Sequence, residues 1–262
     1  MLAVGVGLSA CSRADSGYAQ LDNALEKCEI PTTQGGFTVP DDFGIHLDTG
    51  QQAWLVEHKV RDGDQSRKVA MLTYDDWASS TEFESILAAF RTTKSSKATF
   101  FINGQYLKDM AASVENAVAE GHLIGCHGWC HVNMGTYNEQ EINATFAAFF
   151  NTMHDILPGY PIKFFRMPYG NTKDAEKDKV VLKIAADWGL QHIYWSFYTD
   201  GTKNNVKKIF KENIKPGSIV LCHMNYRYDL EHTPWMIDTL LNQGYTLEAV
   251  DTGIQPADQR RW

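Results

Sequence analysis

The sequence lacks several features that would assign it to common classes of protein. Its 262 residues carry a formal net charge of −8, and acidic and basic residues are mixed along the chain without a basic stripe. Nucleic acid and other polyanions are therefore not expected partners. No apolar run approaches the length that spans a bilayer, and neither a repeat nor a low-complexity tract is present. With 44% hydrophobic residues, the chain has material for one full α/β barrel or two smaller domains.

The N-terminus lacks the positively charged region of an ordinary export signal, but it is apolar up to Cys11. The string LSAC (Leu8–Cys11) resembles the lipobox of bacterial lipoprotein signals. We interpret residues 1–11 as a lipoprotein leader, with a plain secretory signal or a stray leader of small residues as the alternatives. A lipid on Cys11 would be the chain's attachment to a membrane and would place it in the bacterial cell envelope. Residues 12–30 then form a tether, with a short helix expected at Leu21–Lys27.

Cysteine is scarce, with five residues in the chain. If Cys11 is lipidated, four remain, and four cysteines allow three disulfide connectivities between which a sequence cannot choose. Because a core of this size does not need disulfides, we favour free or partly free thiols. The four are Cys28, Cys126, Cys130 and Cys222.

The chain becomes regular after a less ordered start. Residues 31–66 contain turn signals around short apolar runs such as Ala53–Val56, and we expect a small β-rich lead-in. From residue 67 to 254, short apolar strands alternate with amphipathic helices, one of which begins with a capping box at Asn138 and Glu141. Residues 255–262 form a tail. The expected strands are residues 69–74, 98–102, 122–126, 162–165, 192–197, 219–222 and 245–250.

Strict alternation of strands and helices indicates a parallel sheet in an α/β fold. Seven units predict a distorted (β/α)7 barrel, an incomplete relative of the eight-fold barrel, and a doubly wound open sheet is the alternative. In both architectures the chemistry gathers at the carboxyl ends of the strands.

Polar side chains follow those predicted strand ends. Asp75 and Asp76 end the first strand, and His127 and His131 follow the third. The i, i+4 spacing of these histidines lets both imidazoles bind one metal ion. Two histidines and one aspartate suit Zn²⁺, or Co²⁺ or Ni²⁺, with positions left open for water and substrate. The remaining polar residues at this edge are Arg166, Asp200 and His223.

Five strings stand in order at and beyond the predicted strands. They are LTYDDW (Leu72–Trp77), KATFFINGQ (Lys97–Gln105), GHLIGCHGWCHVNM (Gly121–Met134), FFRMPYG (Phe164–Gly170) and PGSIVLCH (Pro216–His223). Together they resemble the polysaccharide deacetylases, the NodB-type domains of carbohydrate esterase family four, over roughly residues 66–250. The resemblance implies a distorted barrel of the polysaccharide deacetylase type, which agrees with the strand count.

The resemblance implies a role for each matching residue. Asp76, His127 and His131 would bind the metal, and Asp75 would be the general base. Arg166 would orient Asp75. His223 would protonate the leaving group, and the backbone N–H of Tyr169 would help to hold the oxyanion. Asp200 is the expected partner of His223.

The match is imperfect at three places, one of which follows His223, where Met224 and Asn225 stand instead of the common aspartate. Trp77 stands where a glycine often follows the aspartate pair, and Gly201 stands where a tryptophan is expected after Asp200. Cys126 and Cys222 each precede a site histidine within a strand. Because strand side chains alternate between faces, we expect both thiols to pack against the helices.

We therefore expect an enzyme that removes acetyl groups, N-acetyl rather than O-acetyl, from an acetylated poly- or oligosaccharide of a cell wall or extracellular matrix. We expect it to act as a monomer. One alternative is a C–N hydrolase on a small linear or cyclic amide, which needs a closed pocket instead of an open groove. The other is a carbohydrate-binding pseudoenzyme, against which the complete set of site residues argues.

Overall fold

The computed structural model describes residues 28–31, 47–93 and 95–255. The expected leader, the tether helix at Leu21–Lys27 and most of the tail lie outside the described residues. Within the described part of the chain, every helix is too short or too polar to cross a bilayer.

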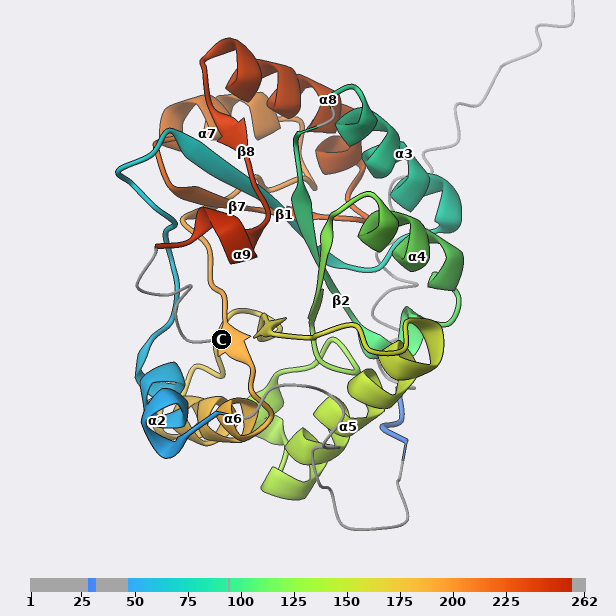
Figure 1. The fold of residues 1–262 in the computed structure, drawn as a ribbon, viewed down its shortest axis with the longest axis vertical. Helices are drawn as coiled ribbons and strands as arrows, with labels where there is room; N and C mark the ends of the chain where they lie inside the picture. Colours follow the sequence, from blue (N-terminus) through green and yellow to red (C-terminus); the bar gives the residue numbers. More distant parts are fainter. Residues whose placement is uncertain (1–27, 32–46, 94, 256–262) are drawn as a thin grey trace, which may run out of the picture.

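An eight-stranded sheet, parallel at every strand pair, forms the centre of the molecule (Figure 1). Its order is β5-β4-β3-β2-β1-β7-β6, and β8 pairs with β1. Although β5 and β6 lie at opposite ends of this order, only residues 193–196 separate them, so the sheet curls into a distorted barrel. The strands are β1 (Val69–Asp76), β2 (Ala98–Ile102), β3 (Leu123–Cys126), β4 (Phe164–Phe165), β5 (Gln191–His192), β6 (Phe197–Tyr198), β7 (Ser218–His223) and β8 (Thr246–Leu247).

The count differs from the predicted seven strands because the expected strand 192–197 divides into β5 and β6. Between them the backbone leaves the ladder, and the N–H groups of Tyr194 and Ser196 donate to Val60 and Ile219. The α/β barrel prediction is confirmed in its architecture.

Helices surround the curled sheet (Figure 1). Several begin at capping boxes, including Ser79 with Glu82 on α3 and the predicted pair Asn138 with Glu141 on α5. These boxes satisfy backbone N–H groups that a helix start leaves unpaired. The helices are α2 (Thr49–Glu57), α3 (Ser80–Arg91), α4 (Ala111–Ala119), α5 (Glu139–Ile156), α6 (Ala175–Asp187), α7 (Val206–Asn213), α8 (Arg227–Asn242) and α9 (Val250–Gly253), with 3-10 turns η2 (Gly104–Tyr106) and η3 (Met134–Thr136).

The prediction of a β-rich lead-in is wrong for residues 49–57, which form α2. A capping box at Asp48 and Gln51 starts this helix, and it packs against α6. A short apolar run such as Ala53–Val56 is compatible with a strand or a helix. The capping box and the packing against α6 favour the helix. Beyond α2, single bridges from Val60 and Asp62 attach the chain to the sheet.

Side chains of β1 divide the core into two layers. Leu72 and Tyr74 belong to the larger apolar cluster, which lies between the sheet and the helices. Met71 belongs to a smaller cluster that also holds Phe101 and Ile219 and fills the inside of the curl. Because all eight residues of β1 are buried, both faces of this strand are covered, as expected in a parallel sheet.

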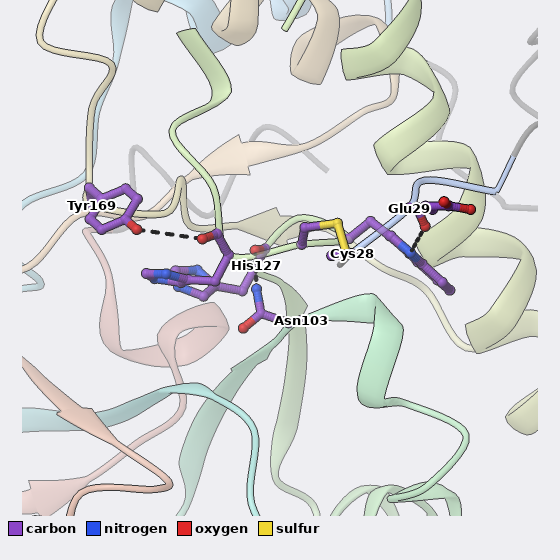
Figure 2. The surroundings of a disulfide bond; sticks show 8 residues. Cys28, Glu29, Asn103, His127 and Tyr169 are labelled. Carbon is purple, nitrogen blue, oxygen red and sulfur yellow. Dashed lines mark hydrogen bonds between the residues drawn. A yellow bond between two sulfur atoms is a disulfide. The ribbon is translucent and has the colours of Figure 1, made fainter. Parts of the chain in front are cut away.

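The cysteines of the described residues fall into two groups. Cys28 and Cys130 form a disulfide (Figure 2), whereas Cys126 and Cys222 are free and buried. Free or partly free thiols were expected, and the structure has two free thiols beside one disulfide that the sequence did not predict. Both free cysteines belong to the larger apolar cluster, between the sheet and the helices, which confirms that they pack toward the helices. Burial raises the pKa of both thiols, so they stay protonated and inert.

The strand register brings the functional candidates to one edge. Asp75 lies opposite His223 in the β1–β7 pair, and Asp76 lies opposite Ile102 in the β1–β2 pair. Ile102 in turn pairs with Cys126, the residue before His127. The carboxyl ends of β1, β3 and β7 therefore meet, and the side chains beyond them converge.

Candidate active site

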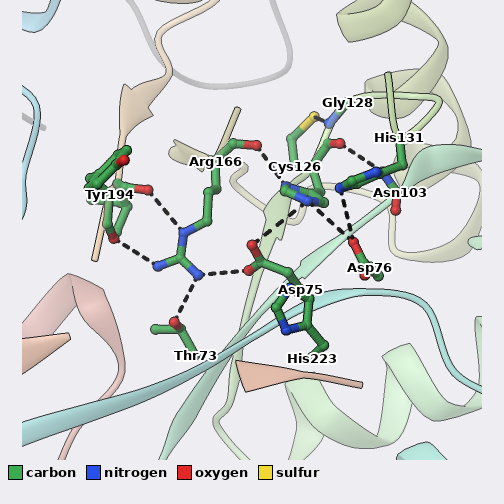
Figure 3. A network of polar contacts seen from close by, with 12 residues as sticks. Thr73, Asp75, Asp76, Asn103, Cys126, Gly128, His131, Arg166, Tyr194 and His223 are labelled. Atoms are coloured by element: carbon green, nitrogen blue, oxygen red, sulfur yellow. Dashed lines mark hydrogen bonds and ion pairs between the residues drawn. The ribbon is translucent and has the colours of Figure 1, made fainter. Parts of the chain in front are cut away.

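A cluster of one carboxylate and two imidazoles lies at the carboxyl edge of the sheet (Figure 3). Asp76 Oδ1 is 3.4 Å from the Nε2 atoms of both His127 and His131. The three potential ligand atoms lie within 4.8 Å of one another. The i, i+4 pair of histidines predicted from the sequence therefore points to one place, together with Asp76.

Asp75 approaches the same cluster although it neighbours Asp76 in the chain. Its Oδ2 atom is 3.7 Å from His127 Nε2. Adjacent residues of a regular strand point to opposite faces, so a straight β1 would separate the two carboxylates. Asp76 has a φ of 81°, in the left-handed region that non-glycine residues seldom adopt. This turn ends the strand and lets both carboxylates face His127, at a conformational cost of about 1–3 kcal/mol.

Asp76 fits a cation. Its Oδ1 atom is buried and has no hydrogen-bond partner among the described residues, although such an atom ordinarily has one. Burial alone would raise the pKa of Asp76, but the nearby imidazoles of His127, His131 and His223 outweigh burial and lower it. Burial lowers the pKa of His131 and so favours its neutral form, the form that binds metals. A buried carboxylate beside two imidazole nitrogens is a ligand set that suits a divalent metal ion.

The orientation of His127 is fixed from behind. Its Nδ1 atom lies 2.8 Å from the carbonyl oxygen of Arg166. A carbonyl can only accept, so Nδ1 carries a proton and donates to it, and Nε2 is the ring nitrogen directed at Asp76. The side chain of Asn103 donates to the carbonyl oxygen of His127 at 2.8 Å. Sequence reasoning missed Asn103, although its place directly after β2, at the same edge, was a usable signal.

Asp75 is held by a buried arginine (Figure 3). Arg166 is 0% exposed, and its Nη1 atom donates to Asp75 Oδ1 at 2.7 Å and to the Thr73 hydroxyl at 2.8 Å. Its other nitrogens donate to the carbonyl oxygens of Ile193 and Tyr194. Burial lowers the pKa of Arg166, and the Asp75 carboxylate opposes this shift. The network fixes one oxygen of Asp75 and leaves the other facing the histidine cluster.

His223 faces Asp75 from β7, and its partner is Asp229. Asp229 is fully buried on the first turn of α8. Its Oδ2 atom accepts the backbone N–H of His223 at 2.8 Å and lies 3.7 Å from His223 Nδ1, an ion-pair distance. Burial alone lowers the pKa of His223, but the carboxylates of Asp229, Asp76 and Asp75 together raise it.

The structure does not bring Asp200 to His223. The Asp200 carboxylate accepts from Thr202 and Lys203 and so closes its own turn. Sequence reasoning missed Asp229, because an aspartate in the first turn of a helix ordinarily serves the helix terminus. Asp229 differs from such an ordinary first-turn aspartate in being fully buried, which the sequence does not reveal.

Tyr169 lies at the open side of the cluster. Its side chain is 54% exposed, its φ is 61°, and its ring meets the edge of the His131 ring. Its hydroxyl approaches the His131 carbonyl oxygen at 3.5 Å. The predicted oxyanion role of its backbone N–H stays a prediction.

Comparison with known proteins shows which family has a similar sequence. Residues 62–193, half of the chain, match the family described as polysaccharide deacetylase. The peptidoglycan-N-acetylglucosamine deacetylase of Bacillus cereus is 27% identical over 231 residues, which cover 86% of this chain and 80% of that protein.

Solved structures of similar fold include PdaA from Bacillus subtilis, described as a family 4 carbohydrate esterase, with a TM-score of 0.65 and 24% identity over 86% of this chain and 98% of that one. A family 4 pseudoenzyme from Bacillus anthracis has a TM-score of 0.68 and 24% identity, covering 76% of this chain and 69% of that one. Both confirm the predicted fold class.

Proposed function

The chain belongs to the polysaccharide deacetylase family of hydrolases, and we propose that it removes N-acetyl groups from the amino sugars of peptidoglycan with the help of a divalent metal ion. The observation that carries this proposal is the convergence of two neighbouring carboxylates on one pair of histidines, with a buried arginine behind one carboxylate and His223 opposite it. A pseudoenzyme exists among the solved relatives, so the complete set of groups, more than family membership, supports catalysis.

Asp76, His127 and His131 are the residues that would hold the metal. The set suits Zn²⁺, and also Co²⁺ or Ni²⁺. When bound, a divalent ion polarises the acetyl carbonyl and lowers the pKa of water in an open position. The buried Oδ1 atom of Asp76, which faces both imidazoles without a hydrogen bond among the described residues, supports this assignment.

Asp75 would act as the general base. Arg166 occupies Oδ1 of Asp75, so Oδ2, 3.7 Å from His127 Nε2, is free to accept a proton from an attacking water beside the cluster. A positioned base of this kind contributes about 10²–10⁴-fold to a hydrolytic rate. Asp76 faces two imidazoles and is less suited to act as the base. Asp75 would therefore be the base and Asp76 a metal ligand.

His223 would act as the general acid. An amine expelled from an amide must be protonated as it leaves, and an imidazole is suited to this near neutral pH. The raised pKa of His223 keeps it protonated closer to neutrality. The β1–β7 register places it beside Asp75, so base and acid flank one reaction centre. The backbone N–H of Tyr169 would complete the site by holding the oxyanion.

The substrate class follows from the setting of the site. Asp75, Asp76 and His127 are buried, but the exposed fractions of 54% for Tyr169 and 22% for the His131 side chain give the cluster one side that faces solvent. We take access from this side to favour a polymer over a small amide in a closed pocket. The Bacillus cereus relative is named for N-acetylglucosamine of peptidoglycan. The Cys28–Cys130 disulfide agrees with an exported protein, as does the lipobox at Leu8–Cys11, which would anchor the chain in the cell envelope.

Acetate release tests the proposal. The purified protein is incubated with peptidoglycan fragments, N-acetylated chitooligosaccharides and O-acetylated xylan, each with added zinc and with a chelator. We expect chelator-sensitive release from the first two substrates. Release from xylan alone would overturn the N-acetyl assignment, and release that the chelator leaves intact would overturn the metal. No release with one bound metal per chain would favour the small-amide hydrolase, and no release without bound metal would favour the pseudoenzyme.

A further inference from the structure

The disulfide joins the N-terminal segment to the loop that carries His131, and the proposed reaction does not use it. Cys28 and Cys130 are 102 residues apart in sequence, with Cα atoms 6.0 Å apart. Cys130 is 2% exposed and directly precedes His131. Figure 2 shows the sulfur bridge beside the segment that leads from His127 toward the contact with Tyr169.

The loop from residue 127 to 133 has no helix or strand of its own. Its first half is attached to η2, where the N–H groups of Gly104 and Gln105 donate to the carbonyl oxygens of Gly128 and Trp129. His127 is fixed further through its Nδ1 atom. Around His131 the Val132 N–H donates to the Cys130 carbonyl within the loop itself at 3.0 Å, the largely exposed Tyr169 donates to the His131 carbonyl at 3.5 Å, and the Asn133 side chain donates to the Thr172 carbonyl at 3.3 Å. The disulfide at the preceding residue adds a covalent restraint from a distant segment, which these hydrogen bonds do not replace.

Trp129 makes a second attachment between the same two segments. Its indole Nε1 donates to the carbonyl oxygen of Glu29 at 3.1 Å (Figure 2). The other side of the ring lies on Gly104, where a Cβ atom would come within 2.4 Å of it. Residues 28–29 thus clamp the loop at two neighbouring positions, one covalent and one polar.

We propose that the Cys28–Cys130 disulfide is a positioning element of the metal centre, which holds His131 in its ligating place before the metal arrives. This rests on the metal role assigned to His131 under the proposed function. Without the cross-link, residues 130–131 would sample more conformations, and metal binding would have to order them. Groups that orient a ligand commonly change metal affinity by about 10- to 100-fold, and we expect a loss of that size here.

The test compares the zinc affinity of the full chain with that of the double variant Cys28→Ala/Cys130→Ala, by competition with a chromophoric chelator. Both cysteines are replaced because a lone thiol beside His131 would offer zinc a new ligand. We expect zinc to bind the variant roughly 10- to 100-fold more weakly. Hydrogen exchange of the metal-free protein should increase over residues 128–133 and stay unchanged in α6.

Two further variants separate positioning from a general loss of stability. Ile86→Val creates a small cavity on α3, where Ile86 is 1% exposed, and should lower the melting temperature without changing zinc affinity. Trp129→Phe keeps the disulfide but removes the hydrogen bond to Glu29, and should weaken zinc binding by a smaller factor, which keeps the proposal testable if the double variant does not fold.

Wild-type zinc affinity in the folded double variant, or in Trp129→Phe if the double variant does not fold, would overturn this proposal and leave the proposed function standing. If the oxidised wild-type chain itself binds no zinc, the metal role of His131 fails and the positioning role fails with it.

Discussion

The two sides of the histidine cluster are held in different ways. Asp75 is fixed from inside the sheet, by an arginine that is 0% exposed and makes contacts to β1 and to the segment after β5. His131 lies on a loop, and the residue before it, Cys130, is joined by a disulfide to Cys28, which precedes the barrel. The side that would move protons is therefore part of the barrel core, and the side that would complete metal binding depends on a remote segment.

Because the two sides are held differently, substitutions on each side should affect different properties of the protein. Changes around Arg166 should alter stability and chemistry together, because a buried charge is part of the core. Changes around Asp229 should alter the acid and spare the metal. Changes at the surface turn of Asp200 should alter neither.

The largest expected effect is that of Arg166→Met. It leaves the buried Asp75 carboxylate without its ionic partner, so the free energy of unfolding should fall by about 3–5 kcal/mol in urea denaturation. Arg91→Met is the matched control. Arg91 pairs with Glu84 and Glu120, but its side chain is 41% exposed, so this variant should cost about 1 kcal/mol or less. Equal losses in the two variants would contradict the view that Arg166 belongs to the core.

An intermediate effect is expected for Asp229→Asn, seen in the pH profile of kcat/KM. Asp229 is one of the carboxylates that raise the pKa of His223, so the variant should lower that pKa and move the alkaline limb of the profile to lower pH. At pH values above the limb, kcat/KM should fall roughly tenfold for each pH unit by which the limb moves. The protonated His223 stabilises the fold below its unfolded pKa, and this contribution disappears as pH rises through the folded pKa, at lower pH in the variant. An unmoved limb would remove Asp229 as the partner of His223.

The smallest effect is expected for Asp200→Asn. Asparagine tolerates the φ of 51° at this position. Its carboxamide oxygen can still accept from Thr202, and the interaction lost is the ion pair with the exposed Lys203. Stability should change by about 0.5 kcal/mol or less, and the alkaline limb should stay in place. A displaced limb here would restore Asp200, the residue expected from the sequence, as the support of His223.

Much of the fold was predictable, because the strands of a parallel sheet read as short apolar runs and their carboxyl ends share one edge. That rule alone predicted that Asp75, His127 and His223 lie at one edge of the sheet. It failed at residues 193–196, where an apolar run continues while the backbone leaves the ladder. It also failed at α2, whose helix depends on a cap and on packing against α6.

The support of the site was less predictable, because it depends on contacts between distant segments. The disulfide could not be chosen among three connectivities, and Asp229 resembles an ordinary residue of a first helical turn. The approach of Asp76 to the same imidazole as Asp75 requires a left-handed φ that no pattern of apolar residues encodes. Sequence patterns identified the groups at the edge, and tertiary contacts decide how they are oriented.

We propose that the two adjacent aspartates have different roles, and measuring bound zinc and acetate release together in Asp75→Asn and Asp76→Asn distinguishes these roles. We predict that Asp75→Asn retains one zinc ion per chain and loses acetate release by about 10²-fold or more, whereas Asp76→Asn loses both. Loss of zinc from Asp75→Asn, or full zinc occupancy in Asp76→Asn, would contradict the assignment.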